Sequence, residues 1–166
     1  MDNSTFLQEQ IEKGRFFLDF IPRNDAATGE TIAQEAVVWY STDDNRIISA
    51  ECFLSEYEEW EEATRLDVWL MDEVCKLWKN MAEARVNPIL LNISDRTVQN
   101  PYCLYDMILS VKNYGVKADS LHIVLTSGTV DGTDQRLERG ITFLKLNNLK
   151  VTDRNRQESV NFNENK

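Results

Sequence analysis

The feature that most constrains the fold is an alternation of apolar, β-prone runs with amphipathic helical stretches after residue 32. The longest helical stretch, residues 63–84, repeats its apolar side chains at intervals of three and four, which is the spacing of one helix face. Strands that alternate with helices usually lie parallel and are joined by helical crossovers. The pattern therefore predicts an α/β domain with mostly parallel strands. It does not choose between a small doubly wound sheet and part of a barrel.

The boundaries of the predicted elements follow from Pro, Gly, Asn and Asp at the breaks in periodicity. Helices are expected over residues 4–14, 49–62, 63–84, 101–114 and 134–147, and strands over residues 16–21, 32–40, 88–93 and 121–126, with a further short strand beginning at residue 150. Pro22 is expected to end the first strand, before a turn over residues 23–29. We expect one domain over residues 1–151 and a polar, disordered tail over residues 152–166.

Charge and composition disfavour several classes of partner. In 166 residues, 28 Asp and Glu face 18 Lys and Arg, for a net charge of −10. Nucleic-acid duplexes and anionic membranes repel such a surface, and no apolar run approaches the ~20 residues that span a bilayer. The N-terminus does not resemble a signal peptide, and three cysteines without metal-like spacing fit a reducing compartment. We expect a soluble, cytoplasmic protein.

One carboxylate lies where an apolar side chain is expected. Glu35 falls in a β-prone apolar run, and burying its charge costs free energy unless a partner or a metal satisfies it. We favour a backbone donor or a neighbouring polar group as the partner, with a metal as the alternative. Asn92, near the end of the third predicted strand, belongs either to a strand end and cap before a turn or to the remnant of a metal site.

Two other polar features have weaker chemical signals. Thr126 and Ser127 begin a small polar loop at a strand end, a place where α/β domains bind ligands. This possible ligand loop lacks the Lys and the glycines of a phosphate-binding loop. His122 is the only histidine and falls in mid-strand, so we interpret it as a structural residue.

Several short motifs follow one another along the chain, and their order and spacing together are more specific than any one of them. Glu35-Ala36-Val37 is followed by Phe53-Leu54, by Leu66-Asp67, by Leu91-Asn92-Ile93-Ser94 and by the strand over residues 121–127. Together they resemble the first half of the EAL domain, the family of cyclic-di-GMP phosphodiesterases that is named for its Glu-Ala-Leu. The resemblance covers residues 5–151. It implies part of a TIM-barrel-like fold, in which Glu35 and Asn92 stand at the positions of two metal ligands.

The chain departs from this family's pattern where the family's chemistry lies. Ile21 stands in place of a Gln, and Trp39 in place of an Arg that contacts the dinucleotide. Val124 replaces a metal-binding Glu, and Ser127 replaces a second Glu. The family's Asp pair, catalytic Lys and general-base Glu lie further along than this chain extends. Hydrolysis with two metal ions needs several carboxylates, and one carboxylate with one amide holds Mg²⁺ poorly.

The resemblance thus predicts a catalytically inactive, degenerate EAL-like module that regulates or binds a protein in cyclic-di-GMP signalling, without a cofactor. The alternative is a cyclic-di-GMP-binding or phosphodiesterase domain completed by a partner chain, which would use Mg²⁺ or Mn²⁺. A relic, or a piece of a longer gene product, is a third possibility. Half a barrel has two sheet edges and an apolar inner face. We therefore expect a homodimer or a protein partner, with cyclic-di-GMP bound weakly at most.

Overall fold

The sheet and its helices are described for residues 3–55, 60–81, 87–126 and 134–153 of a computed structural model. The helices are α1 (Asn3–Glu12), α2 (Ala50–Ser55), α3 (Trp60–Trp78), α4 (Asp95–Gln99), α5 (Pro101–Asn113) and α6 (Gln135–Leu146), with a 3-10 turn at Ala118–Ser120. The strands are β1 (Phe16–Asn24), β2 (Thr31–Ser41), β3 (Ile47–Ser49), β4 (Ile89–Ile93), β5 (Leu121–Leu125) and β6 (Lys150–Asp153).

The described strands form one sheet in the order β1-β2-β4-β5-β6, and β3 pairs with β2. The contacts β2–β4, β4–β5 and β5–β6 are parallel, whereas β1 and β2 form an antiparallel hairpin. Parallel neighbours need a crossover, and α3, α5 and α6 lie in the three crossovers. The α/β fold with mostly parallel strands and crossover helices is therefore confirmed.

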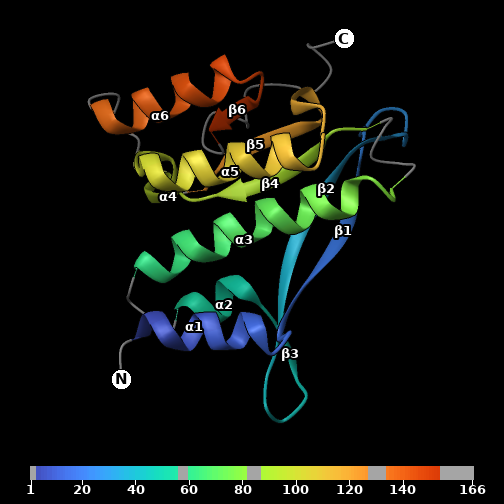
Figure 1. The fold of residues 1–166 in the computed structure, drawn as a ribbon. Helices are drawn as coiled ribbons and strands as arrows, with labels where there is room; N and C mark the ends of the chain where they lie inside the picture. Colours follow the sequence, from blue (N-terminus) through green and yellow to red (C-terminus); the bar gives the residue numbers. More distant parts are fainter. Residues whose placement is uncertain (1–2, 56–59, 82–86, 127–133, 154–166) are drawn as a thin grey trace.

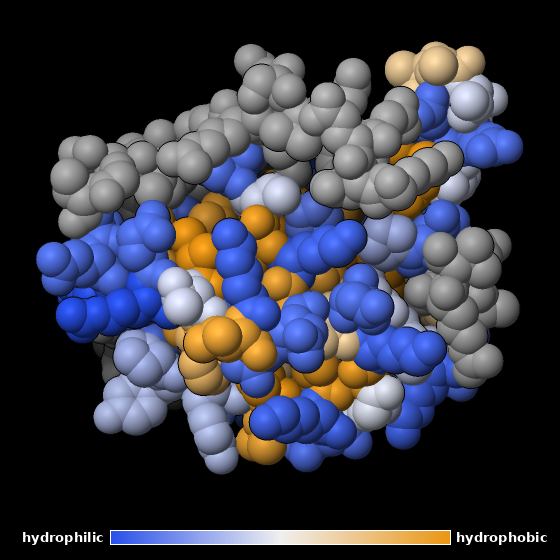
Figure 2. Space-filling view, turned by 90° about the horizontal axis from the view of Figure 1, so that it is seen from above, coloured by the Kyte–Doolittle hydropathy of each residue, from blue (hydrophilic) through white to orange (hydrophobic). Residues whose placement is uncertain are grey.

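The main core lies between the sheet and the helices that cover it. Alternate residues of β4 and β5 point into this core: Ile89, Leu91, Ile93, Leu121, Ile123 and Leu125. They pack against apolar side chains of α3, α5 and α6. In Figure 1, α1 and α2 lie on one side of α3, and α4, α5 and α6 lie on the other. Seen from the side of α6, hydrophobic side chains remain visible between hydrophilic ones (Figure 2).

Helix α6 lies unusually close to α4. A Cβ added to Gly140 of α6 would stand 2.0 Å from the backbone oxygen of Val98, so only glycine fits at this crossing. A second, smaller apolar cluster joins α1, α2 and α3 to β1 and β2. In it the rings of Phe16, Tyr40 and Phe53 contact one another.

The prediction that Pro22 ends the first strand is wrong. Strand β1 continues to Asn24, with Pro22 opposite Gln34. The Gln34 N–H donates to Pro88 on the other side of β2, at 2.9 Å. Pro22 and Gln34 are therefore a non-hydrogen-bonded pair, in which the backbone nitrogen of Pro22 faces away from β2. The ladder needs no N–H at this position, so the proline is tolerated within the strand.

The predicted helix over residues 49–62 is confirmed over Ala50–Ser55 and from Trp60 onward, and it is wrong at Ser49. Ser49 ends β3, which follows a turn at Asn45 (φ 62°) and pairs with β2. The Ser49 hydroxyl accepts a hydrogen bond from Cys52 N at the start of α2. Helix α2 ends at Ser55, and α3 begins at Trp60; residues 56–59 lie outside the described part, as do residues 82–84 of the next predicted helix. Strand β6 includes residues 152 and 153 of the predicted tail, and the rest of that tail lies outside the description.

Candidate functional site

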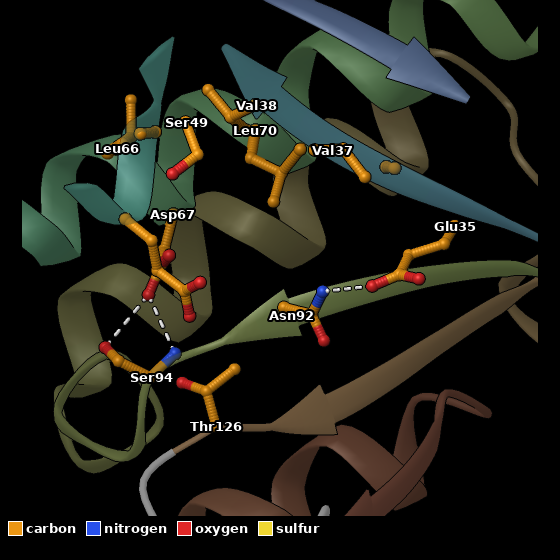
Figure 3. A pocket seen from close by; sticks show the side chains of 13 residues that line it. Glu35, Val37, Val38, Ser49, Leu66, Asp67, Leu70, Asn92, Ser94 and Thr126 are labelled. Atoms are coloured by element: carbon orange, nitrogen blue, oxygen red, sulfur yellow. Dashed lines mark hydrogen bonds between the residues drawn. The ribbon is translucent and has the colours of Figure 1, made fainter. Parts of the chain in front are cut away.

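The two polar residues expected to form the site lie on the sheet face opposite the main core. Because side chains alternate along a strand, Glu35 and Asn92 point to the face opposite Leu91 and Ile93. The register places Glu35 beside Leu90 and Asn92 beside Val124. Asn92 Nδ2 donates a hydrogen bond to Glu35 Oε1 at 2.8 Å (Figure 3). The two residues predicted from the sequence are therefore neighbours in the fold.

A third residue completes the pairing of Glu35. Arg23 of β1 donates from Nε and Nη2 to Glu35 Oε2, forming an ion pair. The Glu35 side chain is 9% exposed and the Arg23 side chain 54%. The buried carboxylate thus has a guanidinium on one oxygen and an amide donor on the other, as the interpretation that Glu35 is satisfied by neighbouring polar groups expects.

Sequence reasoning missed Arg23 because it placed residue 23 in a turn. Within β1, Arg23 lies two residues from Ile21, which is directly opposite Glu35. Both side chains are then on the same face as the carboxylate. The sequence indicates Arg23 as the partner of Glu35 only if the first strand is extended through Pro22 and its register against the second strand is known.

A second carboxylate lies nearby on α3. Asp67 Oδ2 accepts hydrogen bonds from Ser94 N, Ser94 Oγ and Thr97 Oγ1, at 2.9, 2.9 and 2.6 Å. Burial raises the pKa of Asp67 from 3.8 to about 6, although these hydrogen bonds oppose the shift. Ser94 is also the N-cap of α4 and accepts from Thr97 N, so this part of the Asn-Ile-Ser motif is a strand end and helix cap.

Glu35, Asn92 and Asp67 border one cavity of about 230 Å³. Figure 3 shows Ser94 and Thr126 at the end where Asp67 lies and Glu35 at the other end, with Asn92 between them. Apolar side chains of β2 and α3 complete its lining: Val37, Val38, Leu66 and Leu70. The cavity is smaller than the ~300–1,000 Å³ typical of small-molecule pockets.

The remaining predicted positions have distinct surroundings. Val124, where the resemblance to the EAL family places a metal-binding Glu, packs with Ala33 and Leu90 in a buried apolar cluster. Thr126 lines the cavity and its N–H donates to Ile93 O at 3.2 Å. Ser127 lies outside the described residues.

His122 has the surroundings of a structural residue. Its Nε2 lies 3.0 Å from Thr152 Oγ1 on β6, and burial, with Lys150 nearby, lowers the pKa of the imidazole. Within the described part of the chain, no three His, Cys, Asp or Glu side chains form a group that could hold a metal ion.

Comparison with known proteins assigns the chain to a family. The family model of the EAL domain matches residues 5–152. The chain therefore belongs to the EAL domain family, and the resemblance expected from its motifs is confirmed. No curated protein matches the chain. No helix in the described segments is long and apolar enough to cross a membrane.

Solved structures with the same fold include three proteins with EAL parts, two of them solved with c-di-GMP bound. The PaMucR phosphodiesterase, in complex with c-di-GMP, has a TM-score of 0.76 and 18% identity, over 91% of this chain and 62% of that one. The FimX EAL domain from Pseudomonas aeruginosa, bound to c-di-GMP, has a TM-score of 0.73 and 17% identity, over 92% and 62%. LapD from Vibrio cholerae, with its S helix, GGDEF and EAL parts, has a TM-score of 0.74 and 15% identity, over 90% and 36%.

The TM-scores of 0.73 to 0.76 establish a shared fold. The chain spans less than two thirds of the length of each of these solved chains. The sheet described here corresponds to part of a TIM-barrel-like fold.

Proposed function

We propose that this chain is a catalytically inactive EAL module that acts in cyclic-di-GMP signalling by binding a protein, either a partner or a second copy. The observation that carries the proposal is the pairing of Glu35 with Arg23 and Asn92. A guanidinium already supplies the positive charge that a metal ion would bring to this carboxylate.

The donors around Glu35 do not fit a divalent metal ion. Mg²⁺ needs several oxygen ligands in near-octahedral geometry, but Asn92 turns its amide nitrogen toward Glu35. Val124 contributes no oxygen, since its side chain is apolar and buried. Asp67 is engaged by three donors of its own. We therefore propose that the module works without a metal cofactor.

The cavity offers little to a cyclic dinucleotide. It holds about 230 Å³, and Trp39 stands where the resemblance places an Arg for the dinucleotide. An Arg is the side chain that clamps a phosphate with two parallel hydrogen bonds. We expect any cyclic-di-GMP binding to be weak.

The second candidate is a cyclic-di-GMP-binding or phosphodiesterase domain that is completed by a partner chain. The similarity to structures solved with c-di-GMP supports it. In that case Mg²⁺ or Mn²⁺ would be needed.

We place the module in the cytoplasm, since its cysteines Cys52, Cys75 and Cys103 are free thiols.

Calorimetric titration with cyclic-di-GMP, with and without Mn²⁺ or Mg²⁺, tests the proposal. We expect no binding of micromolar or tighter affinity and no metal dependence. The Glu35→Gln variant is the matched control, because it removes a ligand charge and keeps the shape of the side chain. Micromolar or tighter binding that requires the metal and is lost in Glu35→Gln would favour the second candidate.

A further inference from the structure

Two hollows lie along α5 and α6, with volumes of about 440 and 340 Å³. We call the two hollows together the α5–α6 groove. The first is lined by Val98 of α4 with Leu104 and Phe143, and the second by Ile108, Val111 and Leu146. Seen from the side on which α6 lies, hydrophobic side chains are visible between hydrophilic ones (Figure 2).

The groove exposes apolar surface that the fold does not cover. Phe143 and Leu146 lie three residues apart on α6, and their exposed fractions are 38% and 77%. On α5 the two hollows extend from Pro101 to Lys112, which is about 16 Å at 1.5 Å per residue. A strip of this length matches about three turns of a partner helix, a common occupant of apolar grooves.

The charge of the groove is opposite to that of the protein. The side chains that line it include Arg136, Arg139 and Lys112 and no Asp or Glu, although acidic residues outnumber basic ones by 28 to 18 in the chain. In the described part of the chain, no ion pair involves any of these three cations. Unpaired cations beside an apolar floor favour a partner with apolar anchors and acidic flanks.

From this juxtaposition we propose that the α5–α6 groove binds an amphipathic helix of a partner protein whose flanking residues are acidic. The inference rests on the proposed function and deepens it, since it assigns the surface and the chemistry of the partner. Apolar anchors enter beside Phe143 and Leu146, and carboxylates pair with Arg136 and Arg139 at one end and with Lys112 at the other.

The test uses the full chain and a fluorescein-labelled synthetic peptide of roughly 15 residues. The peptide carries Leu on one helical face and Glu on its flanks, and a twin replaces each Glu by Lys. Fluorescence anisotropy measures both affinities. We expect the acidic peptide to bind about tenfold or more tightly than its basic twin, with the preference declining as salt is added.

Two charge-matched variants locate the site. Arg136→Glu with Arg139→Glu reverses two charges in the groove, and Lys76→Glu with Lys79→Glu reverses two exposed charges on and just after α3. The groove variant should lose about tenfold in affinity for the acidic peptide, and the α3 variant should retain the preference of the wild type. Circular dichroism of each variant checks that the fold is kept.

The proposal is overturned if neither peptide binds, if both peptides bind with the same affinity, or if the two double variants have the same affinity for the acidic peptide. If sedimentation shows a dimer that the groove variant dissociates, the occupant would be a second copy of this chain instead. If a single-stranded RNA displaces the peptide, the occupant would be a nucleic acid instead. Hydrolysis of cyclic-di-GMP would refute the proposed function and leave the peptide result unaffected, so the two failures are distinguishable.

Discussion

Replacing Asp67 by Asn should stabilise the protein, and by an amount that depends on pH. The Asp67 carboxylate is half-buried on α3 and accepts three hydrogen bonds from Ser94 and Thr97. Burial nevertheless raises its pKa from 3.8 to about 6. In Asp67→Asn the amide oxygen can accept from the same donors, while the side chain stays neutral at every pH.

The sign and size of the effect follow from linkage. Between about pH 4 and pH 6 the folded protein keeps on Asp67 a proton that the unfolded chain has released, so the free energy of unfolding falls as the pH rises. Above pH 6 the full penalty applies. A pKa difference between 3.8 and about 6 corresponds to about 3 kcal/mol, since each pH unit is worth 1.36 kcal/mol.

Urea denaturation, followed by tryptophan fluorescence at about pH 4.5, 6 and 8, measures the difference between Asp67→Asn and the wild type. The gain should be small at the lowest pH and approach about 3 kcal/mol at the highest. Asp106→Asn, the same change at an exposed carboxyl of α5, reports the effect of losing a surface charge. A difference for Asp67→Asn that is constant across the three pH values would refute the reasoning.

Four further variants test the site and the packing. Glu35→Gln should change the free energy of unfolding by less than about 1 kcal/mol, because the ion pair with exposed Arg23 is weak and a neutral amide is cheaper to bury. Glu35→Ala should cost about 1–3 kcal/mol, because it leaves the Asn92 amide unpaired; equal costs in urea denaturation would contradict this account. Ser94→Ala should destabilise by about 1–2 kcal/mol through loss of the α4 cap, and an unchanged urea midpoint would count against the cap. Gly140→Ala should lower the melting temperature through overpacking of about 1–3 kcal/mol, and a wild-type melting temperature would mean that α6 does not lie so close to α4.

Much of the sheet could be predicted from the sequence, because its parallel strands are short apolar runs between helical stretches. The predicted strands at residues 32–40, 88–93 and 121–126 differ from β2, β4 and β5 by one residue at each end at most. The hairpin was harder, since whether Pro22 ends a strand depends on which side of β1 is paired. Helix α4 was missed because a helix of five residues has too few turns for periodicity to reveal.

The candidate site was only half predictable. Glu35 and Asn92 stand out as polar residues within apolar runs, and their contact follows from parallel register. The ion pair with Arg23 depends on the antiparallel register of β1 against β2, which a slip of one residue would abolish. Asp67 matched a family motif, yet its shifted pKa arises from burial that only the packing of α3 against β4 and α4 creates.

The central claim, that this EAL module is catalytically inactive, is tested most directly by incubating the full chain with cyclic-di-GMP and Mg²⁺ or Mn²⁺ and separating the products by chromatography. An active EAL phosphodiesterase serves as the positive control. The pairing of Glu35 with Arg23 and the apolar Val124 predict no linear dinucleotide above the level of a heat-denatured sample. Linear product that depends on the metal and disappears in Glu35→Ala would contradict the account.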